Sequence, residues 1–141
     1  MIGEILTPDQ VHEQWWQLSE LLAPAVAENY GEMTLTDILE LVEKGRMFIG
    51  VLREPGEEIQ VALVCETIVY PRKKVLSVVF CGGKPLALTR GKRMYTLLEQ
   101  VAKKLECSII QGLCGPAATR YFSRVFGLKP VYTVLRKEVG P

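Results

Sequence analysis

The spacing of apolar residues predicts two helices in the first part of the chain. Thr7 can cap a helix whose apolar positions follow the helical period as far as Pro24, which should kink or end it. Thr34 can cap a second amphipathic helix, and Gly45 is suited to end it. Both segments therefore should pack an apolar face against another layer.

Three strands are expected next: Met47–Arg53, Ile59–Tyr70 and Val75–Cys81. Pro55-Gly56 provides a turn between the first two of them. The third strand is apolar at nearly every position, so both of its faces should be buried between layers. Because the connections are short, the three strands should form an antiparallel meander.

A strong helical pattern over Arg90–Glu106 follows, and Ser108–Leu113 is expected to be another strand. A strand, a crossover helix and a strand imply a right-handed parallel connection. A helix from Gly115 to Gly127 and a last strand over Val131–Val139 complete the expected elements. No repeat, linker or low-complexity segment divides the chain. We therefore predict one α/β domain over residues 1–141, with helices flanking a mixed sheet that is mostly antiparallel.

Composition narrows the class of protein. The chain has 141 residues, 48% of them hydrophobic, which is enough for a substantial core. No apolar run reaches the roughly 18 residues of a membrane span, and the N-terminus lacks the basic region of a signal peptide. The four cysteines form no Cys-x-x-Cys pair, and the single histidine cannot complete a common zinc set. We expect reduced thiols, no metal and a cytoplasmic location.

Charge is divided unevenly along the sequence. The first 70 residues hold 13 acidic and 3 basic residues, a net charge of −10, whereas the remainder holds 14 basic and 3 acidic residues, a net charge of +11. One explanation is a single domain with two oppositely charged faces. The other is a basic face for a phosphate-bearing ligand and an acidic face for a cationic substrate or partner. Nucleic-acid binding by the basic residues is disfavoured, because the first half is acidic and exposed aromatic residues are not interleaved with the bases.

The order of elements, with Gly127-Leu128-Lys129-Pro130 before the last expected strand, resembles the GNAT acyltransferase superfamily. Two segments, Glu66–Leu76 and Tyr132–Glu138, together with Cys81-Gly82-Gly83, more narrowly resemble small GNAT-like proteins of tailed phages and prophages. The resemblance implies a GNAT-like fold. It also implies a location in the host cytoplasm, or in the virion, if the protein is phage-encoded.

The same resemblance implies that acetyl-CoA lies between the strands Val75–Cys81 and Ser108–Leu113, with its pyrophosphate at the start of the following helix. Arg90 matches the first position of the family's phosphate loop, whereas Arg93 and Tyr95 replace its two small residues. Backbone N–H groups in such a loop donate to phosphate. The cofactor-binding residues implied are Val79, Cys81, Arg90, Gly91, Lys92 and Arg93.

Two catalytic positions also follow from the resemblance. Members often place a carboxylate base on the strand before the phosphate loop, but Val75–Cys81 has no acid, and Glu66 on the neighbouring strand is the nearest candidate. The alternative is a structural Glu66 paired with a base such as Arg72. Members often use a tyrosine of the last helix to protonate the leaving thiolate, and Ser123 occupies that position when counted back from the closing glycine. Cys81 as a nucleophile has no obvious histidine partner, which favours a structural thiol.

Two functions remain open from the sequence. The first is an acetyl-CoA-dependent N-acyltransferase that acts on an amine substrate. The second is a catalytically silent GNAT fold that serves as a binding or structural module in a phage particle or against a host protein. The acid-free strand, the replaced phosphate-loop residues and Ser123 support the second function. A protein partner and a homo-oligomer are compatible with both.

Overall fold

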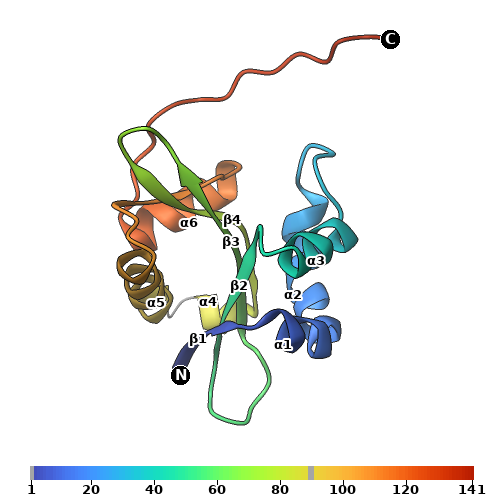
Figure 1. The fold of residues 1–141 in the computed structure, drawn as a ribbon, viewed down its shortest axis with the longest axis vertical. Coiled ribbons are helices and arrows are strands. Elements are labelled where there is room, and N and C mark those ends of the chain that lie inside the picture. The colour runs from blue at the N-terminus through green and yellow to red at the C-terminus, as the bar shows by residue number, and fades with distance from the viewer. Residues whose placement is uncertain (1, 89–90) are drawn as a thin grey trace.

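A five-stranded sheet organises the protein in the computed structural model, which describes residues 2–88 and 91–141 (Figure 1). The strands lie in the order β1-β2-β3-β4-β5. Neighbouring strands are antiparallel from β1 to β4, whereas β5 runs parallel to β4. This confirms the predicted mixed sheet and its parallel crossover. The strands are β1 (Ile2–Leu6), β2 (Phe48–Arg53), β3 (Val61–Val69), β4 (Lys74–Gly83) and β5 (Ile109–Gly112).

Helices cover both faces of the sheet, as Figure 1 shows. The N-terminal helices lie on one face, and α5 and α6 lie on the other. A short helix, α4, lies between β4 and α5 in the chain. The helices are α1 (Pro8–Glu13), α2 (Trp15–Ala27), α3 (Leu35–Glu43), α4 (Pro85–Leu88), α5 (Gly91–Lys104) and α6 (Pro116–Phe126).

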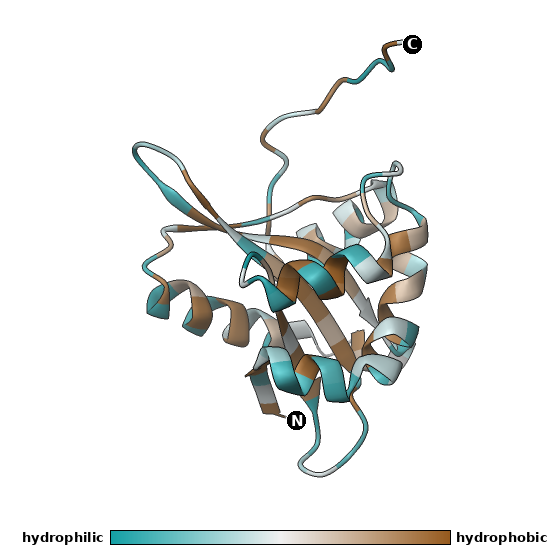
Figure 2. Ribbon diagram, turned by 45° about the vertical axis from the view of Figure 1, so that its right-hand side comes forward, coloured by the Kyte–Doolittle hydropathy of each residue, from teal (hydrophilic) through white to brown (hydrophobic). Residues whose placement is uncertain are grey.

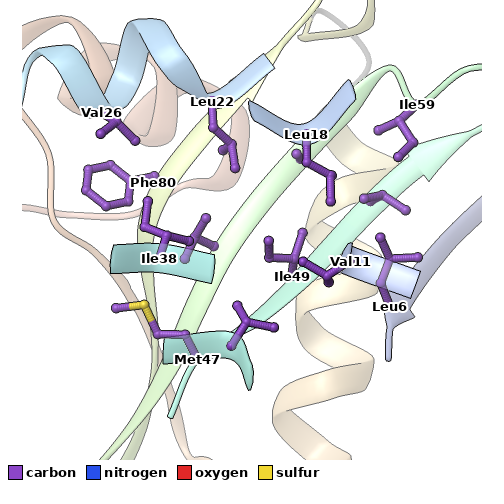
Figure 3. Close-up of a cluster of buried hydrophobic side chains, with 14 residues drawn as sticks. Leu6, Val11, Leu18, Leu22, Val26, Ile38, Met47, Ile49, Ile59 and Phe80 are labelled. Carbon is purple, nitrogen blue, oxygen red and sulfur yellow. The ribbon is translucent and has the colours of Figure 1, made fainter. Parts of the chain in front are cut away.

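Two apolar cores result from this layering, one on each face of the sheet. The first core joins the sheet to α1, α2 and α3 through residues such as Leu18, Ile38 and Ile49 (Figure 3). The second core joins the sheet to α5 and α6 and includes Leu98 and Phe122. In Figure 2 the strands are mainly hydrophobic, while polar residues lie on parts of the helices. Burial on both faces explains why β3 and β4 are apolar along most of their length.

The first predicted helix is divided in two, and it does not end at Pro24. Gln14 leaves helical geometry, with φ −104° and ψ 16°, and separates α1 from α2. Pro24 lies inside α2, which continues to Ala27. An internal proline removes one helical hydrogen bond. The buried face of Leu18, Leu22 and Val26 holds the helix against the sheet in spite of that loss.

Two further differences concern the ends of the chain. Strand β1 was not expected from the sequence, and it pairs with β2 from Ile2 to Leu6. The expected last strand is wrong: Val131–Val139 has no regular structure and projects from the domain as an extended segment (Figure 1). No helix in the described ranges is long and apolar enough to cross a membrane.

Replacing Leu98 should test the packing of α5. Its side chain is buried in the second core, so Leu98→Ala should lower the free energy of unfolding by about 2–5 kcal/mol. Urea denaturation measures this change, and Val69→Ala is the control because Val69 is mostly exposed. A Leu98→Ala variant as stable as the wild type would contradict the packing of α5 on the sheet.

Buried thiols give a second test of the fold. Burial raises the pKa of Cys65 from 9.0 to about 12, and burial together with the neighbouring Cys114 raises the pKa of Cys81 to about 12. At pH 8 their thiolate fractions should be about a thousandfold smaller than in the unfolded chain, so both should resist alkylation until urea is added. Alkylation in native buffer as fast as in urea would contradict the raised pKa values of both thiols.

The same pKa shifts predict how stability depends on pH. The unfolded chain loses these protons from about pH 9, whereas the folded chain keeps them until about pH 12. The free energy of unfolding should therefore decrease as pH rises through that window. Cys65→Ala should make the decrease shallower, which urea denaturation at several pH values would measure. An unchanged slope would contradict a protonated, buried Cys65.

Candidate functional site

The pairing of β4 changes at Val79, and this change opens the sheet. Cys65 of β3 pairs with Val78 and Val64 pairs with Phe80, so Val79 is an unpaired, bulged residue. Pairing between β4 and β5 also ends at this point, with Val78 opposite Gly112. Beyond it, the described part of the chain supplies no strand partner to the β5 side of β4. The two parallel strands part here, which leaves backbone groups that can bind an extended ligand as a strand would.

One residue after the end of the ladder, the backbone still ties the two strands together. The N–H of Leu113 donates to the carbonyl oxygen of Val78 at 3.1 Å. The two strands therefore separate directly after this hydrogen bond, between Val79 of β4 and Leu113 of the segment after β5. We call the space between the last residues of β4 and the segment after β5 the β4–β5 opening.

A row of polar residues crosses the sheet next to this opening. Glu66 of β3 lies opposite Ser77 of β4, and Ser77 lies beside Gln111 of β5. Val64 belongs to the first core, so strand alternation places Glu66 on the face covered by α1, α2 and α3. Residues that lie opposite each other on neighbouring strands point to the same face of a sheet, so Ser77 and Gln111 are on the face covered by α1, α2 and α3 too.

Ser77 is the unusual member of this row. Its side chain is fully buried, and its hydroxyl has no hydrogen-bond partner among the residues that the structure describes. A buried hydroxyl without a partner costs about 1–3 kcal/mol, so such groups are few in folded proteins and Ser77 marks this row as a candidate site. Glu66 is half-buried beside it on the neighbouring strand, where a carboxylate could take a proton from a bound amine.

Tyr121 of α6 reaches toward the opening from the other face. Its hydroxyl donates to the carbonyl oxygen of Leu88 at 2.7 Å. Burial, followed by the neighbouring Cys81 thiol, raises the pKa of Tyr121 to about 12. The phenol therefore keeps its proton throughout the physiological range and can act as a proton donor.

Aromatic packing holds this tyrosine in position. The Tyr121 ring contacts Phe122 and Phe126 with centroid separations of 5.4 and 5.9 Å. Tyr95 packs on Phe126 at 5.8 Å, so its ring turns toward the end of α6. Tyr95 replaces a small residue of the phosphate loop described above, and a ring pointing toward the start of α5 would obstruct a phosphate there. The contact with Phe126 favours a ring that turns away.

Side chains of α6, rather than the Tyr95 ring, cover the start of α5. Gly91 is buried, and a Cβ atom at this position would lie 2.1 Å from Cγ1 of Val125 and 3.0 Å from the Tyr121 hydroxyl. Lys92 and Arg93 are exposed on the outer side of the first turn. Arg93 lines an open pocket of about 360 Å³ that also includes Ile2 of β1.

The structure thus brings together some of the residues predicted from the sequence. Val79 and Cys81 lie at the opening, and Glu66 lies on the sheet beside it. Ser123 is exposed on α6, and Arg90 lies outside the described residues. The described residues contain no cluster of three or more histidine, cysteine or acidic side chains suited to a metal ion.

Sequence analysis missed Ser77, Gln111 and Tyr121 as site residues. A serine in an otherwise apolar, doubly buried strand was a usable signal for Ser77. For Tyr121, the signal was its spacing of four residues from Val125, which places the two side chains on one side of α6, next to the buried Phe122.

Comparisons with known proteins give a structural likeness without a sequence match. No protein-family model matches the chain, and no curated protein matches it. Ribosomal-protein-alanine N-acetyltransferase from Brucella melitensis biovar Abortus 2308 superposes with a TM-score of 0.74 at 12% identity, covering 99% of this chain and 100% of its own.

Two other solved structures agree. The aminoglycoside acetyltransferase meta-AAC0020 from an uncultured soil metagenomic sample, in complex with sisomicin, has a TM-score of 0.70 at 14% identity, covering 99% of this chain and 95% of its own. A GNAT family acetyltransferase from Staphylococcus aureus subsp. aureus USA300_TCH1516 has a TM-score of 0.69 at 14% identity, covering 98% of each chain. The chain therefore has the fold of the GNAT acetyltransferases over almost its whole length.

Proposed function

We propose that this protein is an acyl-CoA-dependent N-acyltransferase whose acceptor is a cationic amine. The observation that carries the proposal is the β4–β5 opening, which has a carboxylate on one side and a protonated phenol on the other. The fold shared with acetyltransferases is compatible with this chemistry. Because a fold does not determine a function, the proposal depends on the residues at the opening.

The opening fits the thioester arm of an acyl-CoA donor better than it fits the phosphates. On its β5 side, the backbone from Val79 to Cys81 has no strand partner among the described residues, so it offers hydrogen-bonding groups along an extended path, which suits the amide groups of such an arm. Gly91 cannot cradle a phosphate, because α6 side chains cover it. The phosphates would meet the exposed cation of Lys92 instead. The donor would supply the acyl thioester.

The residues of this chain would manage the protons. Glu66 would accept a proton from the acceptor's ammonium group, directly or through water. Tyr121, which burial keeps in its protonated form, would provide a proton for the sulfur that leaves the thioester. The first 70 residues include α1–α3 and carry a net charge of −10, which favours a positively charged acceptor on the Glu66 side.

A catalytically silent module is the second candidate, and one observation favours it. Val125 and Tyr121 lie against Gly91 at the start of α5, where an anion would otherwise meet free N–H groups. If α6 always covers the start of α5, the protein would have the fold but bind no CoA, and it would serve as a binding module.

Donor binding should distinguish the two candidates. Calorimetry with acetyl-CoA and with desulfo-CoA should give binding that weakens as ionic strength rises, because phosphates and Lys92 attract each other through solvent. Lys92→Gln should weaken binding several-fold and reduce the salt dependence, while the control Lys44→Gln changes a distant cation and should do neither. An absence of binding at millimolar ligand would favour the silent module.

The proton-transfer roles can be tested by substitution. With a panel of polyamine, aminoglycoside and peptide acceptors, Glu66→Gln should lower kcat by more than about tenfold, since a positioned general base contributes roughly 100-fold or more. A wild-type rate for Glu66→Gln would remove Glu66 from the mechanism.

Tyr121→Phe and Ser123→Ala form a matched pair of substitutions in α6. Tyr121→Phe should lower kcat more than Ser123→Ala, because the phenol lies at the opening and the serine is exposed on α6. Urea denaturation of Tyr121→Phe separates catalysis from the lost hydrogen bond to Leu88, whose net contribution is about 1 kcal/mol. A larger effect of Ser123→Ala would reverse the assignment.

A further inference from the structure

The C-terminal segment after α6 has the composition of a strand but has no strand partner among the described residues. Residues 129–141 have no regular structure, and no backbone hydrogen bond within the described part of the chain involves them. Five large apolar side chains of this segment are 72–95% exposed: Val131, Tyr132, Val134, Leu135 and Val139. Figure 2 shows hydrophobic stretches along its projecting course. β-branched and aromatic residues at such density are typical of a paired strand.

The sheet, in turn, has an open edge. β5 is the last strand of the sheet, and β4 is its only strand partner among the described residues. All four β5 residues are half-buried, and Leu113 just after them is 58% exposed. An open pocket of about 290 Å³ lies beside this edge and is lined in part by Ser108, Ile109 and Leu128. An edge of this kind presents unpaired N–H and C=O groups that readily accept another strand.

The C-terminal segment does not follow the β5 edge of its own chain. It leaves the domain at Leu128, which lines the same pocket as the start of β5. It then crosses the end of the sheet toward the α2–α3 connection, where Arg136 pairs with Glu32 at 2.7 Å (Figure 1). That ion pair joins two exposed side chains and contributes little stability. Among residues 2–88 and 91–141, neither the segment's backbone nor the outer edge of β5 has a strand partner.

We propose that residues 131–139 of one copy add as a strand to the β5 edge of a second copy, and that the exchange is reciprocal. Each copy carries one strand to give and one edge to receive it, so a two-fold dimer satisfies both at once. The exchange would bury the apolar side chains that are now exposed and would close an edge otherwise prone to aggregation. This inference does not depend on the proposed enzymatic function.

The oligomeric state of the full chain tests the proposal. Light scattering and sedimentation should give twice the chain mass of 15.8 kDa at micromolar concentration. Leu135→Asp and Val134→Pro should each raise the dimer dissociation constant at least about tenfold, the first by placing a charge in the strand and the second by removing an N–H group and restricting the backbone. Both positions are exposed in the single copy, so the variants should fold normally. Trp16→Asp is the matched control, because Trp16 is an exposed apolar residue of α2, and its replacement should leave the dimer intact.

Hydrogen exchange identifies the edge that is used. Amides within 131–139 and the outward amides of β5 should exchange slowly in the wild-type dimer and quickly in Leu135→Asp. A monomer with protected amides in 131–139 would show pairing within one chain, and a monomer with unprotected ones would show no pairing. A dimer lost in Trp16→Asp but kept in Leu135→Asp, or one whose β5 amides are unaffected by Leu135→Asp, would show a different interface. Each of these results would overturn the proposal.

Discussion

The bulge at Val79 is the constraint on which the rest of this structure depends. Before it, Leu76 and Val78 face the second core, and strand alternation would send Phe80 to the same side. The extra residue reverses the pattern, so Phe80 enters the first core while Cys81 turns toward Tyr121. The bulge also coincides with the end of β5 pairing. One unpaired residue therefore both completes a core and opens the sheet.

The close approach of α2 depends on the same reversal. After the bulge, Gly82 faces α2, and a Cβ atom there would lie 2.0 Å from the carbonyl oxygen of Leu21. Glycine is needed at this point because the helix backbone occupies the space of a side chain. The α2 helix can then lie directly on the final residues of β4, beside the polar row that begins at Glu66. The packing of one face and the position of the candidate site are thus linked through β4.

The sequence predicted those helices and strands whose spacing of apolar residues shows which of their faces are buried. The periodicity of α5 and the apolar run of β4 each require layers on particular sides, and the parallel crossover follows from their order. The bulge could not be predicted, because Val78, Val79 and Phe80 are all apolar and show no break in alternation. Strand β1 has only five residues, mostly exposed, so its formation depends on pairing with β2.

The last expected strand failed for a different reason. Val131–Val139 has the composition of a strand, but strand formation requires a partner, and composition does not say which chain provides it.

The candidate site was predictable only in part. It depends on which face of a strand or helix each residue occupies, as well as on the residue's place in the sequence. Glu66 could be found by asking for the nearest acid, yet its neighbours Ser77 and Gln111 are set by strand register. Counting back from Gly127 selects Ser123, whereas the inward side of α6 is defined by Tyr121, Phe122 and Phe126. The cover over Gly91 depends on how α6 packs on α5, and no local pattern contains that information.

The central claim is that the β4–β5 opening is the place where this protein holds an acyl-CoA thioester. Mapping of backbone amide resonances by nuclear magnetic resonance during titration with acetyl-CoA tests it most directly. The account predicts the largest changes at Phe80, Cys81, Leu113 and Cys114, which border the opening, and small changes along β1 and β2. Changes confined to the exposed first turn of α5, or no changes at millimolar acetyl-CoA, would contradict it.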